Sequence, residues 1–203
     1  MTDEVAASLT ALLDLVSDQI YDAEHTSLRM HFDADWKPLG DVHSYGHEIE
    51  ASWLLDHACE VLGEMHYIKR FKQMDLALAT QVMAAAFAKD ALDYSTVRGI
   101  TDKRRVWWVQ AEGVVGFLNA FCQSGNPDFH HKALALWSFI KTKQIDRRPG
   151  SEWHAELTED GMRMETAFGI AGPWKCPYHN GRMCLEVMKR TNPDANPVDS
   201  HKI

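Results

Sequence analysis

Most of the chain has the hydrophobic spacing of amphipathic helices. Residues 4–21 repeat apolar side chains three and four positions apart, which is the pattern of a helix with one face on a core. These apolar positions are Val5, Leu9, Leu12, Leu13, Val16 and Ile20. Similar reasoning predicts five further helices, over residues 47–62, 68–92, 107–122, 128–145 and 181–190.

Strand-like alternation is confined to two short segments. Residues 28–36 and 151–157 read as short strands, the first because its apolar and polar side chains alternate. The segments 93–105 and 168–182 are polar or rich in Gly and Pro, which predicts loops. The chain is therefore expected to be all-α, with about six helices and short β-hairpin elements.

The predicted helices alternate in character. Those over 47–62, 107–122 and 181–190 begin in segments rich in Trp, Tyr and His, whereas the other three are plainly amphipathic or Ala-rich. This alternation suggests two layers, with every other helix directing its N-terminus toward a shared site. The free N–H groups and positive dipole end of each helix would favour negative charge there.

Composition narrows the class of protein. The 203 residues carry 21 Lys and Arg against 29 Asp and Glu, a formal charge of −8, which argues against nucleic acid or an anionic membrane as a partner. No apolar stretch reaches the roughly 18 residues of a membrane span. The N-terminus lacks the features of a signal peptide, and the 4 cysteines are too few for a disulfide scaffold. We therefore expect a cytoplasmic, acidic globular protein.

The first candidate cluster is the segment 44–50, which includes Tyr45, with Ser52 and Trp53 beyond it. His47 and Glu50 are three positions apart, so they share one face of the predicted helix. A carboxylate beside an imidazole raises its basicity, as a general base requires. A His–Glu pair that caps the helix start is the structural alternative.

The second cluster is a pair of adjacent tryptophans, Trp107 and Trp108. They cannot both point into the same core, so at least one should line a cleft or a partner surface. Glu112 lies on the same helix face as Trp108. An indole can stack on a sugar ring and a carboxylate can bind its hydroxyl groups. The alternative is a pair of tryptophans divided between two packed layers.

The third cluster is the segment 174–182. It contains Trp174, His179 and Arg182 and almost no aliphatic core former. Loops dense in aromatic and hydrogen-bonding groups more often carry function than packing. His179 lies at the predicted start of the last helix.

Two spacings superficially suggest zinc ligands. His43 and His47 are four positions apart, and Cys176, His179 and Cys184 are close in sequence. Neither forms an HExxH motif or a CxxC pair. The G-x-S-x-G elbow of a serine hydrolase is also absent. We therefore expect no metal and no other cofactor.

Four segments together resemble the cellobiose 2-epimerase family, which belongs to the wider N-acylglucosamine 2-epimerase group. They are SYGHEIEASWLL (44–55), WWVQAEGVVGFLNAF (107–121), GSEWHAEL (150–157) and PWKCPYHNGRMCLE (173–186). Several of these motifs fall in the family's order and spacing. The likeness covers nearly the whole chain and matches the C-terminal half of the family.

The resemblance implies half of an (α/α)6 barrel, with the motif-bearing helices inside and the others outside. Residues 1–191 would form this half, and residues 192–203, with two prolines, a loose tail. Family members are about twice as long, so an N-terminal half that supplies an Arg and a further His is missing here. The chain would then be a fragment, the partner of a separate N-terminal chain, or a half that self-associates to complete the ring.

The resemblance also implies a reaction. Family members invert C2 of the reducing-end glucose of a β-1,4-linked disaccharide, without metal or nicotinamide. The ring opens, a base removes the C2 proton to give an enediol or enediolate, and a proton returns on the opposite face. By motif, His47 and His179 would be the two bases, and Glu50 would orient His47 or hold a sugar hydroxyl.

The same resemblance implies the substrate-binding residues. Trp107, Trp108 and Trp174 would form stacking walls for the sugar. Glu112 would bind hydroxyl groups. Tyr45 and Arg182 complete the expected set.

Three alternatives remain open from the sequence. A monosaccharide 2-epimerase or an aldose–ketose isomerase, of the N-acylglucosamine or mannose type, would use the same enediol. An (α/α)6 glycoside hydrolase could use Glu50 and Glu112 as paired carboxylates, although both histidines would then be idle. A half that lacks its N-terminal part could also be an inactive sugar-binding protein.

Overall fold

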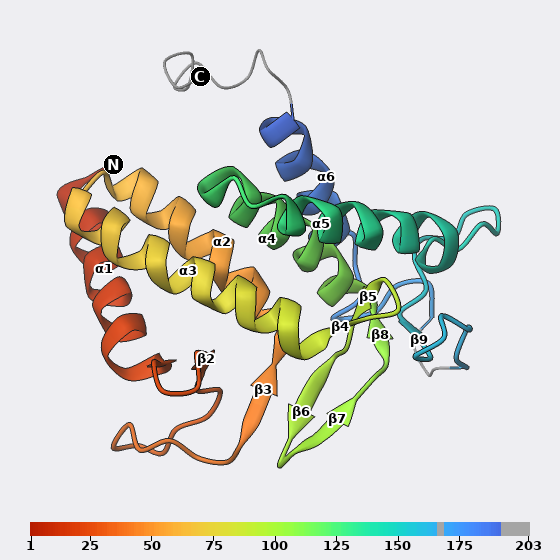
Figure 1. Ribbon diagram of the computed structural model, residues 1–203, viewed down its shortest axis with the longest axis horizontal. Helices are drawn as coiled ribbons and strands as arrows, with labels where there is room; N and C mark the ends of the chain where they lie inside the picture. Colours follow the sequence, from red (N-terminus) through yellow and green to blue (C-terminus); the bar gives the residue numbers. More distant parts are fainter. Residues whose placement is uncertain (166–168, 192–203) are drawn as a thin grey trace.

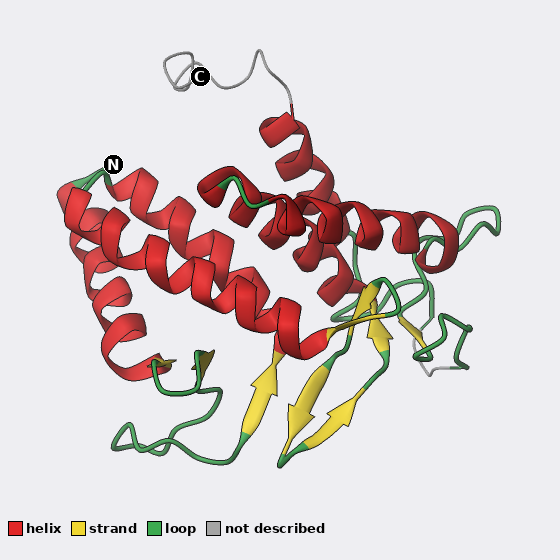
Figure 2. Ribbon diagram, viewed as in Figure 1, coloured by secondary structure: helices red, strands yellow, loops and turns green. Residues whose placement is uncertain are grey.

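Helices make up most of the structure (Figures 1 and 2). A computed structural model describes residues 1–165 and 169–191, and six α-helices follow one another in this part of the chain. They are α1 (Asp3–Leu15), α2 (Tyr45–Leu62), α3 (Met65–Ala86), α4 (Trp107–Ser124), α5 (Pro127–Phe139) and α6 (Tyr178–Thr191). The six predicted helices are confirmed, and the tail predicted at 192–203 lies outside the described residues.

The helices form two layers. α2, α4 and α6 lie side by side, with α4 in the middle, and α3 and α5 pack against this row (Figure 1). α1 lies against α2 at one edge. This is the alternation of inner and outer helices that the sequence predicts.

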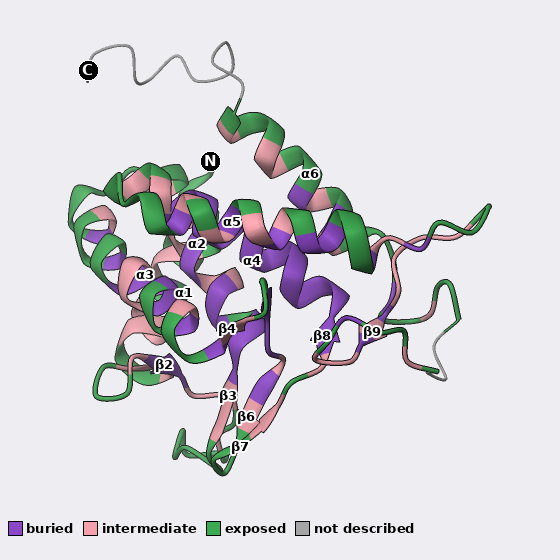
Figure 3. Ribbon diagram, turned by 45° about the vertical axis from the view of Figure 1, so that its right-hand side comes forward, coloured by how far each residue is buried: buried purple, intermediate pink, exposed green. Residues whose placement is uncertain are grey.

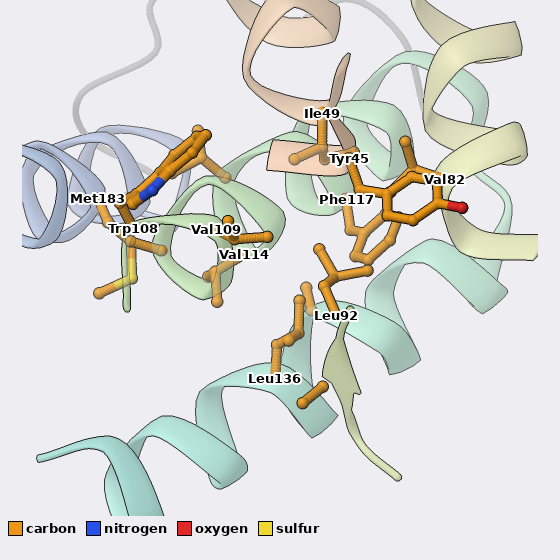
Figure 4. Close-up of a cluster of buried hydrophobic side chains, with 14 of the residues drawn as sticks. Tyr45, Ile49, Val82, Leu92, Trp108, Val109, Val114, Phe117, Leu136 and Met183 are labelled. Carbon is orange, nitrogen blue, oxygen red and sulfur yellow. The ribbon is translucent and has the colours of Figure 1, made fainter. Parts of the chain in front are cut away.

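α4 is the buried centre of the fold. Every residue from Trp107 to Ala120 is buried, which Figure 3 shows as a continuous purple ribbon. α2 crosses close to α4 because Gly116 has no side chain at the crossing point. A Cβ on Gly116 would lie 2.8 Å from the carbonyl oxygen of Ile49. The main hydrophobic core surrounds α4 (Figure 4) and includes Ile49, Val82, Leu92, Val109, Phe117 and Leu136.

A second, smaller core lies between α1 and the helix pair α2 and α3. Its buried residues are Leu13, Leu28, Cys59, Tyr67, Phe71, Met74 and Leu78. α1 continues into one π-helical turn over Val16–Ile20, and α5 does the same over Ile140–Gln144. These turns extend the two helices over nearly all of the predicted ranges 4–21 and 128–145.

The strands are short and antiparallel. β1 (Tyr21–Asp22) pairs with β2 (Ser27–Leu28), β4 (Phe87–Ala88) with β5 (Ala91–Leu92), and β8 (Arg105–Val106) with β9 (Glu156–Leu157). β3 (Val42–Ser44), β6 (Ser95–Val97) and β7 (Ile100–Asp102) form a three-stranded sheet below the start of α2.

The prediction of a helix over 68–92 is wrong at its C-terminal end. α3 stops at Ala86, and β4 and β5 form a hairpin whose turn residues Lys89 and Asp90 have left-handed φ angles of 52° and 61°. The side chain of Gln110 donates to the carbonyl of Leu92 and accepts from its N–H. Gln110 comes from α4, so a tertiary contact outweighs local helix propensity here.

The segment 93–105, predicted as a loop, instead contains β6, β7 and the start of β8. Arg98 and Gly99 at the tip have φ angles of 49° and 75°, the left-handed pair that a tight hairpin turn requires.

The two predicted strands are mostly wrong. Of residues 28–36, Leu28 is in a strand; the Asp33 carboxylate then accepts the N–H groups of Asp35 and Lys37, both at 2.9 Å, which reverses the chain. Of residues 151–157, the last two form β9.

None of the described helices is both long enough and apolar enough to cross a membrane.

Candidate active site

The first turns of α2, α4 and α6 meet and bring three aromatic side chains together. The ring centroid of Trp108 lies 4.8 Å from that of His47 and 5.4 Å from that of His179. Trp108 packs this closely because Gly46 has no side chain; a Cβ there would overlap the indole. Figure 4 shows Trp108 at the edge of the buried cluster, beside Met183 of α6.

Glu112 is the buried acceptor of this site. Its Oε1 lies 2.7 Å from Nδ1 of His179, and its Oε2 accepts the indole N–H of Trp53 at 3.0 Å. Only 1% of the Glu112 surface is exposed, so these partners replace water around the carboxylate. A His179 ring that donates Nδ1–H to Glu112 keeps its Nε2 as the free, basic nitrogen.

Arg182 joins the two carboxylates of the site. Its Nη2 donates to Glu112 at 2.8 Å and also to Glu50. Its Nη1 donates to the hydroxyl of Tyr178 at 2.7 Å, and the guanidinium lies 5.0 Å from the ring centroid of Trp53. The positive guanidinium therefore offsets the electrostatic repulsion between the Glu50 and Glu112 carboxylates.

His47 is held by a neutral group. Its Nδ1 lies 2.7 Å from Oγ of Ser44, the residue that precedes α2. Glu50, which we expected beside His47, turns toward Arg182 instead. Partial burial lowers the pKa of His47, an effect that the charge of Glu50 opposes. The lowered pKa favours the neutral imidazole, the form that a base requires.

Three predicted site residues lie outside this contact network. Tyr45 is buried, and its hydroxyl is 2.7 Å from Oγ1 of Thr96 in β6. Trp107 is buried on the side of α4 that faces Lys175, whose Nζ is 5.9 Å from the indole centroid. Trp174 is 83% exposed, so no wall of the described site contains it. The prediction that the two adjacent tryptophans cannot share one core is wrong, because both are buried and both belong to the main hydrophobic core.

Sequence reasoning gave no role to three residues that hold the site together: Ser44, Trp53 and Tyr178. Helical spacing carries a signal for each. Ser44 and Trp53 are three positions from His47 and Glu50, respectively, and Tyr178 is four positions before Arg182. What spacing could not show is the contact of Trp53 with Glu112 of α4 and Arg182 of α6.

Glu50, Glu112 and His179 are close enough to share a cation, since one ligand atom of each lies within 4.8 Å of the others. Arg182 donates to both carboxylates, so the positive charge between them comes from the chain itself. His43 approaches Asp41 and Glu48 rather than pairing with His47 on an ion. In the described part of the chain, Cys176, His179 and Cys184 do not come together as a ligand group.

Comparisons with known proteins agree on one family. The sequence model of N-acylglucosamine 2-epimerase (GlcNAc 2-epimerase) matches residues 4–180. The chain is 44% identical over 188 residues to a cellobiose 2-epimerase of Ruminococcus albus, which covers 93% of this chain and 48% of that protein. For a cellobiose 2-epimerase of Dictyoglomus turgidum the identity is 43% over 179 residues, covering 88% and 46%.

Solved structures give the same result. The cellobiose 2-epimerase of Bacillus thermoamylovorans matches with a TM-score of 0.88 and 38% identity, over 93% of this chain and 48% of that one. The chain thus spans about half the length of the curated relatives it matches. Its two helical layers are half of an (α/α)6 barrel, as the resemblance implies. On this sequence match and this fold, the chain belongs to the N-acylglucosamine 2-epimerase family.

Proposed function

We propose that this chain is the catalytic half of a sugar epimerase, which inverts C2 of the reducing-end glucose in a β-1,4-linked disaccharide such as cellobiose. The observation that supports this most strongly is the pair of imidazoles, His47 and His179, whose ring centroids lie 4.8 Å and 5.4 Å from that of Trp108. Each has Nδ1 engaged by a protein group, Ser44 for His47 and Glu112 for His179. Each therefore offers Nε2 to a substrate.

The proposed chemistry is two-base proton transfer. After the sugar ring opens, one imidazole removes the C2 proton and leaves an enediolate. The other imidazole starts protonated and donates its Nε2 proton to the opposite face of C2, which inverts that carbon and leaves this ring neutral. His47 enters the reaction neutral because its pKa is lowered. Glu112 stabilises the imidazolium that forms when His179 takes a proton.

The remaining residues would bind the sugar or shape the site. Trp108 offers an indole face as a stacking wall, with Trp107 behind it. Trp174 lies on the loop before α6, outside this wall. Glu50 would accept hydroxyl hydrogen bonds where Arg182 leaves an oxygen free. Tyr45 would support the site indirectly, because its hydroxyl group bonds to Thr96 in β6.

We further propose that the partner of this chain is the N-terminal half of such a barrel. An apolar groove of about 370 Å³ runs between α4, α5 and α6. Leu134 on α5 and Met188 on α6 are 52% and 65% exposed at this edge. This chain matches about half of each solved relative. In a closed barrel, the other half would pack against this edge.

The deciding experiment is proton NMR of cellobiose in D2O. The chain is tested alone and with the recombinant N-terminal half of the Ruminococcus albus relative. Loss of the C2 proton signal and growth of the mannose-type epimer support the proposal. An (α/α)6 complex that binds cellobiose without C2 exchange would instead indicate a sugar-binding protein. Exchange with ketose as the product would indicate an aldose–ketose isomerase.

A further inference from the structure

The loop that leads to His179 has little regular structure. Residues 169–177 precede α6 without helix or strand, and one backbone hydrogen bond within the loop joins the N–H of Gly172 to the carbonyl of Lys175 at 2.8 Å. A catalytic side chain at the end of such a loop needs an external anchor, because loops move more than the elements they join.

Glu152 provides that anchor. One oxygen of its carboxylate accepts a hydrogen bond from Nζ of Lys175, and the other accepts from Nδ2 of Asn180. These two donors flank His179, four positions before it and one position after it. Lys175 also donates to the carbonyl of Ile170 at 2.9 Å. One side chain therefore holds both ends of the short segment that carries the imidazole.

Burial makes this contact strong. Lys175 is 1% exposed, and a buried ammonium group is stable only beside an opposite charge. Glu152 supplies that charge, and the Trp107 ring adds a cation–π contact at 5.9 Å. Loss of the Glu152 carboxylate would leave the ammonium group without its counter-charge, so Lys175 would turn to solvent and carry the loop with it.

Glu152 is itself fixed to the helix that carries the rest of the site. Its carbonyl accepts the N–H of Asp146 at 2.9 Å. Three residues later, the carbonyl of Ala155 accepts the N–H of Trp107 at 3.0 Å. Trp107 is the first residue of α4. The segment that carries Glu152 is therefore hydrogen-bonded to the helix that carries Glu112.

We propose that Glu152 is a positioning residue for His179: it holds Lys175 and Asn180 so that the imidazole stays against Glu112. The claim that the position of His179 matters to proton transfer rests on the proposed function. The contact itself is independent of that function. Glu152 does not touch the reacting atoms.

The test compares Glu152→Ala with Glu156→Ala. Glu156 is a carboxylate on the same segment that pairs with Arg104 at 2.8 Å and accepts no hydrogen bond from the described residues of the loop. In Glu152→Ala, the imidazole signals of His179 in NMR spectra should shift and broaden. Amide hydrogen exchange over 169–181 should rise at least about tenfold, while exchange in α4 stays slow. Glu156→Ala should leave both readouts as in the wild type.

Two further variants separate positioning from folding. Asn180→Ala removes one anchor and keeps the buried ion pair, so His179 should shift in a chain of near-normal stability. Glu152→Leu with Lys175→Met replaces the ion pair by apolar packing, which restores stability in other proteins. His179 should remain displaced in this double variant. Native His179 signals in both variants would overturn the proposal.

Activity gives a second readout. In the assembled enzyme, Glu152→Ala should lower kcat for C2 exchange by about 100-fold and change KM by less than about twofold, because misplacement of a catalytic group affects the chemical step. A kcat equal to that of Glu156→Ala would overturn the positioning role. Wild-type protein without exchange would count against the proposed function alone, since the NMR shifts report the anchor independently.

Discussion

The two histidines of the site differ in the group that holds Nδ1. A neutral hydroxyl holds His47, and a buried carboxylate holds His179. A carboxylate stabilises the protonated ring more than a hydroxyl does. The two bases of the proposed reaction are therefore not equivalent, and each can be tested through its own partner.

Ser44→Ala should free the His47 ring to exchange between its two neutral tautomers. Its ¹⁵N imidazole shifts should then move toward averaged values, while those of His179 stay as they are. Ser52→Ala is the matched control, because its hydroxyl bonds the Ile49 carbonyl in the same helix. Unchanged His47 shifts in Ser44→Ala would contradict the assigned contact.

His179→Ala should lower C2 proton exchange by about 10²–10⁴-fold, the usual contribution of a general acid or base. Cellobiose binding should fall only modestly, because the Trp108 wall remains. Deuterium incorporation and a tryptophan fluorescence titration measure the two effects. His131→Ala, which removes an exposed imidazole on α5 outside the apolar groove, serves as the control. Equal exchange rates in both variants would reject the role of His179.

At the scale of elements, the site depends on how closely α2 approaches α4. Gly116→Ala should destabilise the fold by about 1–3 kcal/mol, because its Cβ would overlap the Ile49 carbonyl and side chain. Gly181→Ala is the matched substitution on α6, where nothing lies within 4 Å of the added Cβ. That variant should be more stable by about 0.5–1 kcal/mol. Denaturant unfolding measures both, and equal midpoints would refute the packing argument.

α3 carries a buried carboxyl group that makes stability depend on pH. Burial raises the pKa of Asp75 to about 9, and the charge of Asp56 adds to the shift. The folded chain keeps this proton while the unfolded chain releases it above about pH 4, so stability should fall as pH rises between these values. Both carboxyl oxygens of Asp75 are buried without a hydrogen-bond partner in the described structure.

Asp75→Asn should remove that dependence. Relative to the variant, the wild type should lose up to about 1.4 kcal/mol of unfolding free energy per pH unit between pH 5 and 8. Urea unfolding at several pH values measures the difference, with Asp35→Asn in an exposed loop as control. A pH-independent difference between wild type and Asp75→Asn would show that the carboxyl group is ionised in the fold.

At the scale of the whole molecule, an apolar groove lies at the edge of the half-ring formed by α5 and α6. Leu134→Asp should weaken association with an N-terminal half at least about tenfold, since it places a charge in a desolvated contact. Met65→Asp is the control, because Met65 is equally exposed on α3 away from the groove. Light scattering and titration calorimetry measure the complex. Self-association of the wild type, lost in Leu134→Asp alone, would identify a second copy as the partner.

The helices and their alternation were predictable because the signals are local. Apolar spacing places six helices, and the aromatic starts of every second helix indicate the inner layer. Predictions failed where a side-chain hydrogen bond to the backbone, local or from another helix, set the local structure. Asp33 turns the chain within the expected strand over 28–36, and Gln110 holds a hairpin at the expected end of α3.

By itself, the sequence determined the six helices, the half-barrel class and the family. Apolar periodicity and motif spacing are local signals, so short stretches of chain carry them. Only the tertiary structure decided which group each site residue contacts. Glu50 turns from the neighbouring His47 to Arg182, 132 positions away, and His179 meets Glu112 across 67 positions. These pairs form because buried charges must find opposite charges or hydrogen bonds, and packing alone decides which ones lie within reach.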